Sequence, residues 1–155
     1  MGFFSSMNIS ATALTAQRLR MDTISENIAN VNTTRTADGG PFQRRTVIFE
    51  EIHDIDPITL AFDNVFGSIF GGTPAHQSRG VRVSQIVRDE TPGLLKFDPT
   101  HPDANADGYV RLPNVNIVEE MVNMISATRS YEANITAMQN SRHIMQRTLE
   151  IGQGR

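Results

Sequence analysis

The sequence predicts an α+β subunit in which long N- and C-terminal helices pair as a coiled coil beside a small β-rich middle module. Apolar residues recur at heptad spacing near both ends, and short β-branched and aromatic runs separated by turn residues lie between them. Heptad spacing makes a narrow apolar seam, which packs against another helix rather than onto a broad core. We therefore divide the 155 residues into a helical assembly segment at 1–34, a middle module at 35–112 and a long assembly helix at 113–155.

The first heptad segment runs from residue 7 to residue 31. Asn8 or Ser10 is expected to cap its start, because either side chain can accept a hydrogen bond from a free backbone N–H group. The Asn- and Thr-rich stretch at 30–34 is expected to end it, since these side chains compete for backbone hydrogen bonds. The apolar seam of this segment consists of Met7, Leu14, Met21, Ile24, Ile28 and Val31.

A second, longer heptad segment follows Pro113, with Asn116 placed to cap its start and Gly152 placed to end it. About 35 residues of helix would span roughly 50 Å, so this helix needs a partner along most of its length. We expect Glu132 and Asn134, which flank the seam, to contact neighbouring subunits. The seam consists of Ile117, Met121, Met124, Tyr131, Ile135, Met138, Met145 and Leu149, with Thr128 and Arg142 interrupting it.

The middle module is expected to contain short strands and turns. A turn is predicted at 37–41, where Asp, Gly and Pro follow one another. Residues 52–80 are too apolar for a plain linker and too rich in Gly and Pro for a regular helix, so we interpret them as a partly ordered excursion. Alternating or β-branched runs predict strands at 46–49, 81–88, 94–97 and 109–112.

Composition argues against several classes of function. The formal net charge is -3 and the basic residues form no stripe, which argues against nucleic acid as a partner. The chain has no cysteine, which excludes disulfides and thiolate-bound metal. No apolar run approaches the roughly 18 residues of a membrane span, and the first residues lack the basic and apolar regions of a cleaved signal. We expect a protein that does not span a membrane.

Candidate chemical sites are sparse. Residues 103–108 match the opening of a calcium loop, but Asn114 stands where the bidentate acidic ligand should be, so we interpret them as an Asx-rich turn leading into a strand. The four histidines form no ligand pair, and His143 is interpreted as a packing residue beside the seam. No nucleophile elbow, P-loop or dinucleotide fingerprint occurs. We expect no enzyme activity, no cofactor and no small-molecule substrate.

Motifs at both ends of the chain resemble the rod and hook family of axial proteins of the bacterial flagellum. The resemblance covers roughly residues 5–50 and 80–152, and the C-terminal motifs narrow it to a component of the rod. At the front it is carried by Ala13-Leu14, Ala16-Gln17, Met21-Asp22 and the run Asn27-Ile28-Ala29-Asn30-Val31-Asn32-Thr33. At the back it is carried by His101-Pro102-Asp103-Ala104, Gly108-Tyr109-Val110-Arg111, Pro113-Asn114-Val115-Asn116, Val118-Glu119-Glu120-Met121, Tyr131-Glu132-Ala133-Asn134 and Leu149-Glu150-Ile151.

The resemblance implies a structural subunit of the basal-body rod, which polymerises into the drive shaft that transmits torque across the periplasm and forms part of the export channel. It implies that other copies of the chain, other rod proteins and the flagellar type III export apparatus are its partners, and that export needs no cleaved signal. The N-terminal helix would then form an assembly interface that includes Asn27 and Asn30 besides its apolar seam.

Two other functions remain open at this point. A soluble coiled-coil adaptor or export chaperone would have the same seams but would form a closed oligomer in dilute solution. A small calcium-responsive hydrolase or binding enzyme would show a calcium-dependent change that disappears with Asp103→Ala.

Overall fold

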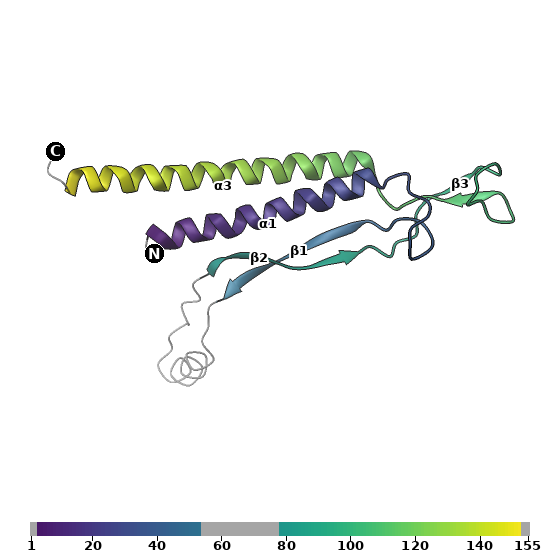
Figure 1. Ribbon diagram of the computed structural model, residues 1–155, viewed down its shortest axis with the longest axis horizontal. Coiled ribbons are helices and arrows are strands. Elements are labelled where there is room, and N and C mark those ends of the chain that lie inside the picture. Colours follow the sequence, from purple (N-terminus) through teal and green to yellow (C-terminus); the bar gives the residue numbers. More distant parts are fainter. Residues whose placement is uncertain (1–2, 54–77, 153–155) are drawn as a thin grey trace, which may run out of the picture.

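A computed structural model describes residues 3–53 and 78–152 of the chain. Two long helices run antiparallel to each other and form the elongated body of the molecule (Figure 1). Two antiparallel pairs of strands complete the fold. In chain order the elements are α1 (Phe3–Ala29), β1 (Arg45–His53), β2 (Ser78–Arg88), β3 (Leu95–Phe97), β4 (Tyr109–Arg111) and α3 (Ile117–Gly152).

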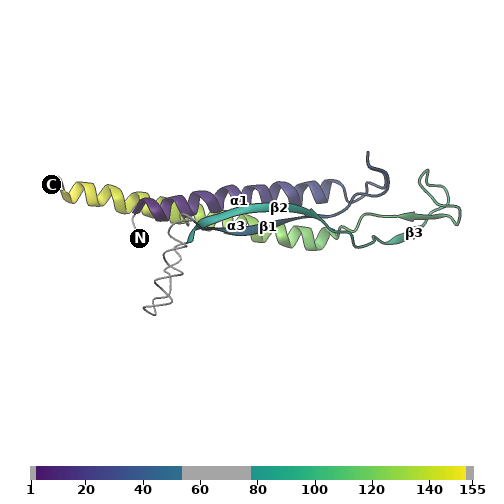
Figure 2. The same ribbon diagram turned by 90° about the horizontal axis from the view of Figure 1, so that it is seen from below.

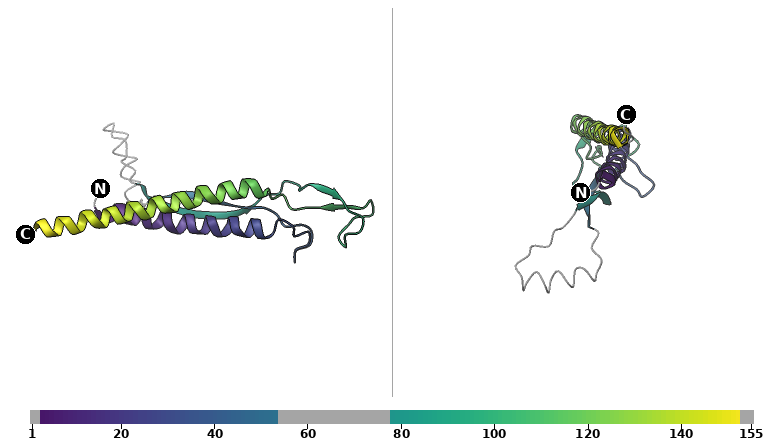
Figure 3. Two further views of the ribbon diagram at one scale, coloured as in Figure 1. Left: turned by 90° about the horizontal axis from the view of Figure 1, so that it is seen from above. Right: turned by 90° about the vertical axis from the view of Figure 1, so that its left-hand side faces the viewer.

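Helix α1 is the central element. It packs against α3 on one side and against the β1–β2 ribbon on another, as Figure 1 and the end-on view in Figure 3 show. Two contacts set the helix register: the Asn27 amide donates to Glu120 at 2.9 Å, and the Thr128 hydroxyl lies 3.7 Å from the Met21 sulfur. The end of α1 therefore lies beside the start of α3, and α3 continues past the start of α1 (Figure 1).

The β1–β2 ribbon pairs antiparallel from Arg45 opposite Arg88 to His53 opposite Ser78, with irregularities after Ile48 and after Glu51. Its valines alternate as the sequence predicts, since Val81 and Val83 are half-buried and Arg82 between them is exposed. The ribbon therefore covers α1 with one face and leaves the other to solvent.

The β3–β4 hairpin projects beyond the helix pair, at the end of the molecule opposite the C-terminus (Figure 2). Leu95 lies opposite Arg111 and Phe97 opposite Tyr109, and the two aromatic rings meet edge to face with centroids 5.2 Å apart. Val110, on the other face of the hairpin, is buried. One face of this short hairpin is thus packed within the subunit, and the other is open.

Wholly buried apolar residues are few in the described chain, and two of them are alanines in the helices. Ala16 in α1 and Ala127 in α3 are small enough to let neighbouring backbones approach closely. The buried apolar side chains of the described residues are Ala16, Ile24, Phe42, Val110 and Ala127. Most other apolar side chains of the described residues keep some contact with water.

The end of α1 and the start of α3 agree with the sequence analysis, whereas the start of α1 does not. Asn116 caps α3 as predicted, its side-chain oxygen accepting from the Val118 N–H at 3.0 Å. α1 begins at Phe3, so the predicted cap at Asn8 or Ser10 is wrong. Ser and Asn disfavour a helix interior by only a few tenths of a kcal/mol, ~0.5 on the usual scales, which packing of α1 on both sides outweighs.

The middle module contains the predicted strands in slightly different extents. β1 and β2 are longer than expected, so that residues 52–53 and 78–80 of the expected excursion lie in strands. The rest of that segment, 54–77, lies outside the described residues. The turn at 37–41 is confirmed, with Gly39 and Gly40 both at positive φ.

Gly80 gives a test of how closely β2 approaches α1. Its φ is +132°, and a Cβ at this position would collide with the Thr12 hydroxyl. We expect Gly80→Ala to lower the free energy of unfolding by about 1 to 3 kcal/mol, through backbone strain and displacement of Thr12. Thermal unfolding followed by circular dichroism measures this.

Gly39→Ala is the matched control, because Gly39 has φ +82° but open space around it. Gly39→Ala should lower the free energy of unfolding through backbone strain alone, and therefore by less than Gly80→Ala. Equal destabilisation by the two variants would show that β2 does not press on α1 at Thr12.

Candidate assembly site

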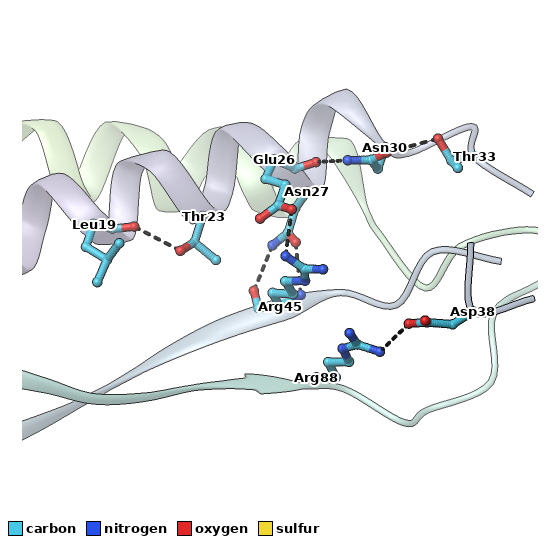
Figure 4. A network of polar contacts seen from close by, with 9 residues as sticks. All are labelled: Leu19, Thr23, Glu26, Asn27, Asn30, Thr33, Asp38, Arg45 and Arg88. Carbon is cyan, nitrogen blue, oxygen red and sulfur yellow. Dashed lines mark hydrogen bonds and ion pairs between the residues drawn. The ribbon is translucent and has the colours of Figure 1, made fainter. Parts of the chain in front are cut away.

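A polar joint ties together the end of α1, the start of β1 and the first turn of α3. Its centre is Asn27, whose side chain is only 1% exposed. The Asn27 amide donates to the Arg45 carbonyl at 2.8 Å and to the Glu120 carboxylate at 2.9 Å, and its oxygen accepts from the Arg45 N–H at 2.9 Å. Figure 4 shows Asn27 reaching the backbone of Arg45. The side chain thus pairs with β1 as a neighbouring strand would.

Glu120 supplies the charge of this joint. It is also 1% exposed, and its carboxylate accepts from Arg44 Nε at 2.8 Å and from Arg44 Nη2 at 2.7 Å. A buried carboxylate is stable only when it is paired and hydrogen-bonded, and here Asn27 and Arg44 provide both conditions. The first turn of α3 is therefore held to α1 and to the residue before β1 at the same time.

Asn114 extends the joint to the loop that leads into α3. Its oxygen accepts from the Arg44 N–H at 2.8 Å, and its amide donates to the Asp89 carbonyl at 2.9 Å. The Asp89 N–H in turn donates to the Arg44 carbonyl at 2.7 Å. One asparagine therefore fixes the end of the β1–β2 ribbon relative to α3.

The turn after α1 is held by side chains of the run that carried the resemblance. Asn30 donates to the Glu26 carbonyl at 2.9 Å and accepts from the Thr33 hydroxyl at 3.1 Å (Figure 4). The Thr34 hydroxyl donates to Asp103 at 2.8 Å, which ties this turn to the loop between β3 and β4. These contacts explain why α1 stops at Ala29.

Two loop carboxylates, those of Asp89 and Asp98, have lowered pKa values. The hydroxyl and backbone N–H of Thr91 lower the pKa of Asp89, and the Thr100 hydroxyl chiefly lowers the pKa of Asp98. Both groups therefore stay ionised in mildly acidic solution. Their contribution to stability is present at neutral pH and is lost as the pH falls through the lowered values.

The expected interface of α1 is largely covered within the chain. Ile24 and Asn27 are buried, and the remaining residues are half-buried, namely Met7, Leu14, Met21, Ile28, Asn30 and Val31. Ser10, Ala16 and Thr23 are buried as well, although the heptad pattern did not indicate them. They are covered because α1 has neighbours on two sides, which a single seam does not predict.

The expected interface of α3 divides into two groups. Met124, Tyr131, Asn134, Ile135 and Met138 are half-buried, on the side of α3 that packs against α1. Ile117, Met121, Glu132, Met145 and Leu149 are exposed. Thr128, which was expected to interrupt the seam, lies within the helix contact beside Met21.

An outward apolar stripe runs along the first three turns of α3. Its members recur at spacings of three and four residues; Ile117 borders the seam, and the other four lie on the side of the helix away from Ala127 and α1. Their exposed fractions range from 45% for Ile117 to 68% for Val118. The outward stripe consists of Ile117, Val118, Met121, Val122 and Ile125. Contiguous exposed apolar surface of this kind marks an interaction site.

The residues that suggested calcium binding are used otherwise. The Asn105 oxygen accepts from the N–H groups of Asp107 and Tyr109 at 3.1 and 2.8 Å, which is the predicted Asx turn. Asp103 accepts from Thr34 and lies 3.7 Å from Arg35. Within 3–53 and 78–152, no three His, Asp or Glu side chains gather where they could hold a metal ion. Neither described helix is long and apolar enough to cross a membrane.

Two family profiles match the N- and C-terminal parts of the chain, and known proteins match it over nearly its whole length. The profile "Flagella basal body rod protein" matches residues 7–35, and the profile "Flagellar basal body rod FlgEFG protein C-terminal" matches residues 106–151. The flagellar basal-body rod protein FlgC of Borreliella burgdorferi is 48% identical, over 99% of this chain and 100% of its own length. The chain belongs to the FlgC family of flagellar basal-body rod proteins.

Other members of the FlgC family agree along their full length. The Bacillus subtilis protein is 43% identical over 96% of this chain and 97% of its own, and the Aquifex aeolicus protein is 38% identical over 97% of each. These relatives are named as rod proteins and not as enzymes. The chain is accordingly a structural subunit of the flagellar basal-body rod, and the adaptor or chaperone alternative is not favoured.

The two segments that match the flagellar rod profiles meet at the polar joint. Asn27 belongs to the first matched segment and Glu120 to the second, and their side chains are hydrogen-bonded to each other. The sequence analysis predicted Asn27 as an interface residue but assigned no such role to Glu120 or Arg44. Glu119 and Glu120 both look like favourable acids in the first turn of a helix, and only the fold buries one of them.

The joint can be tested by removing its carboxylate. We expect Glu120→Ala to lower the free energy of unfolding by about 3 kcal/mol, near the low end for a broken buried ion pair because Arg44 can turn to water. Urea unfolding of the purified chain measures this. Glu119→Ala is the matched control on the exposed side of the same turn and should change stability by less than ~0.5 kcal/mol. A similar loss in both variants would rule out the joint as the reason.

Proposed function

We propose that this chain polymerises with other copies of itself and with other rod proteins into the axial shaft that transmits torque across the periplasm and encloses part of the export channel. In this proposal α1 and α3 pair as a coiled coil in the inner tube, and the β-rich module lies outside it. Membership of the FlgC family supports the rod assignment, and the exposed surface of α3 supports the mode of assembly.

The single observation that carries the mode of assembly is the outward stripe of α3. The α1-facing side of this helix is occupied within the subunit, yet Val118, Val122 and Ile125 remain more than half exposed on the other side. Burial of such residues contributes roughly 1.5 to 3 kcal/mol for each side chain. A neighbouring helix that covers the stripe would therefore contribute much of the energy of assembly.

An open, head-to-tail series of contacts fits the function of a shaft. If the outward stripe contacts a different surface on the next subunit, the contact does not close on itself and the subunits follow a helix. Torque must then pass from subunit to subunit without hinging. The polar joint serves this purpose by fixing the β module to both helices through Asn27, Arg44 and Glu120.

The sparse core supports export in an unfolded form through the flagellar type III apparatus. Few apolar side chains are wholly buried in the described chain, so the free subunit gains little from folding alone. A chain of low stability is easily kept unfolded during transport, and the contacts made on assembly then supply the missing stability.

A charge on the outward stripe should block assembly without unfolding the subunit. We expect Val122→Asp to abolish recovery of the chain in isolated basal bodies and to abolish swimming, because the carboxylate would have to be desolvated in the new helix contact. The chain is followed by immunoblotting of purified basal bodies from cells that lack their own copy.

Asn140→Asp is the matched control, since Asn140 is exposed on the same helix and gains the same charge outside the stripe. It should be recovered in basal bodies and should support swimming. Normal rods built from Val122→Asp would exclude the stripe as an assembly surface.

Glu132 and Asn134 can now be separated as interface candidates. Glu132 is exposed, whereas Asn134 is half-buried and donates to the Ser130 carbonyl of its own helix at 2.8 Å. We expect Glu132→Ala to reduce incorporation into rods with an unchanged melting temperature of the free chain. Asn134→Ala should instead leave incorporation unchanged, because the Asn134 side chain is hydrogen-bonded within its own helix. The opposite pattern would remove Glu132 from the interface.

A further inference from the structure

A trough runs along α1 between α3 and the β1–β2 ribbon. Helix α1 packs against both neighbours, yet in the described chain no Cα atom of α3 lies within 8 Å of a Cα atom of β1 or β2. The surface between them contains a hollow of about 270 Å³ near the polar joint and one of about 330 Å³ nearer the start of α1. We call this surface the α1 trough, and its main lining residues are Ile9, Ala13, Arg20, Ile24, Phe49 and Asn123.

The α1 trough combines apolar side chains with a cation. Ile24 is buried, and Ile9, Ala13 and Phe49 are half-buried, so the trough offers apolar surface along most of its length. Arg20 is also half-buried, although a guanidinium group normally stays in water or is paired. An elongated surface of this composition is suited to one side of an amphipathic helix.

Arg20 is the one arginine of the trough that has no partner among the described residues. The other two, Arg44 and Arg45, are paired with Glu120 and Glu26 at 2.7 and 2.6 Å. If a neighbour covered the trough, the Arg20 guanidinium would lose water, and this is favourable only when a carboxylate takes its place. The neighbour must therefore bring an acidic side chain beside its apolar ones.

The first turns of α3 carry an acid of this kind at the flank of the outward stripe. Glu119 lies three residues before Val122 and seven before Ser126, so the three side chains form one ridge along the helix. All three are exposed, and Glu119 makes no hydrogen bond or ion pair with the other described residues. We call Glu119, Val122 and Ser126 the acidic ridge.

We propose that the acidic ridge of one copy of this chain enters the α1 trough of a second copy, where Glu119 pairs with Arg20. The unpartnered carboxylate and the unpartnered guanidinium complement each other in charge, and each lies beside apolar side chains. This inference rests on the proposed function as a polymerising subunit, and it names the surface that receives the outward stripe.

The polar joint decides the direction of the docked helix. Asn27 and Glu120 close the trough beyond Arg20, so a helix that starts at this point can continue only toward Ala13. The seven residues from Glu119 to Ser126 span about 10 Å, as do the seven from Arg20 back to Ala13. The small Ser126 then lies over Ala13, and both copies have the same orientation. Because the two surfaces differ, the contact leaves a free trough and a free ridge for further copies.

Charge reversal tests the pairing of Arg20 with Glu119. Arg20→Glu, Glu119→Arg and the double variant each replace the native copy in cells, and recovery in purified basal bodies is measured by immunoblotting. We expect roughly tenfold lower recovery of each single variant, because a like-charged pair would be desolvated in the contact, and near-normal recovery of the double variant. Normal recovery of either single variant would overturn the proposal, and so would a double variant no better than the single ones.

The matched control combines Arg20→Glu with Glu150→Arg. It has the same net charge as the charge-swapped chain, but its new arginine lies 31 residues after Glu119 on the exposed end of α3. Recovery should stay as low as with Arg20→Glu alone. Equal rescue by the two double variants would show that net charge matters and the pair does not, which would overturn the proposal.

Cysteine cross-linking identifies the partner, because the chain has no cysteine of its own. The double variant Ala13→Cys, Ser126→Cys keeps both charges and places thiols where the second turn of the ridge should meet the trough. After oxidation of basal bodies with diamide, we expect dimers and longer ladders of the chain on non-reducing gels. Ala13→Cys combined with Asn140→Cys, on an exposed site outside the ridge, should give no dimer. Equal dimer formation by both pairs, or no dimer from either, would overturn the contact between copies.

The native chain is measured in the same preparations, which separates this contact from the rod function. Absence of the native chain from basal bodies would overturn the rod function and the contact together. Its presence alongside normal recovery of Arg20→Glu would overturn only the contact. Since neither Arg20 nor Glu119 has a partner among the described residues, both purified single variants should melt at the temperature of the native chain.

Discussion

The rest of the fold depends on the burial of one carboxylate, that of Glu120. A charged group at 1% exposure is tolerated only with full pairing, and its partners come from two other parts of the chain, Asn27 in α1 and Arg44 before β1. Because the partners are hydrogen-bonded with defined directions, they set the register of the helices and the position of the ribbon together. Apolar packing between the helices, which is non-directional, could not do this by itself.

The helix register set by this joint decides which surfaces the subunit offers to neighbours. With the end of α1 fixed beside the start of α3, the longer helix must overhang at the far end, since α3 has 36 residues and α1 has 27. The same placement puts Ala127 against α1 and turns Val118 and Val122 outward. The helix register fixed by the polar joint therefore also determines which apolar side chains of α3 face solvent.

The sequence predicted features that depend on neighbouring residues, such as helix caps. It did not predict the contacts made where α1, the start of β1 and α3 come together. Cap residue Asn116 bounds the start of α3 as expected, because capping is a local interaction. Heptad spacing identified Met21 and Tyr131 but also included Ile117 and Leu149, which are exposed, because periodicity shows a face and not what covers it. The burial of Glu120 beside exposed Glu119 could not be predicted, since it needs the position of Arg44 in space.

The division between a rigid polar joint and a meagre apolar core suits a subunit that completes its folding on assembly. If the isolated chain buried its apolar surface fully, nothing would remain to attract a neighbour, and export in an unfolded form would be opposed by its stability. If the free subunit had no fixed structure, its whole conformational entropy would be lost on assembly, and this loss would weaken binding to each neighbour. Here the directional contacts are made within the chain, and apolar side chains on α3 and on the β3–β4 hairpin remain exposed.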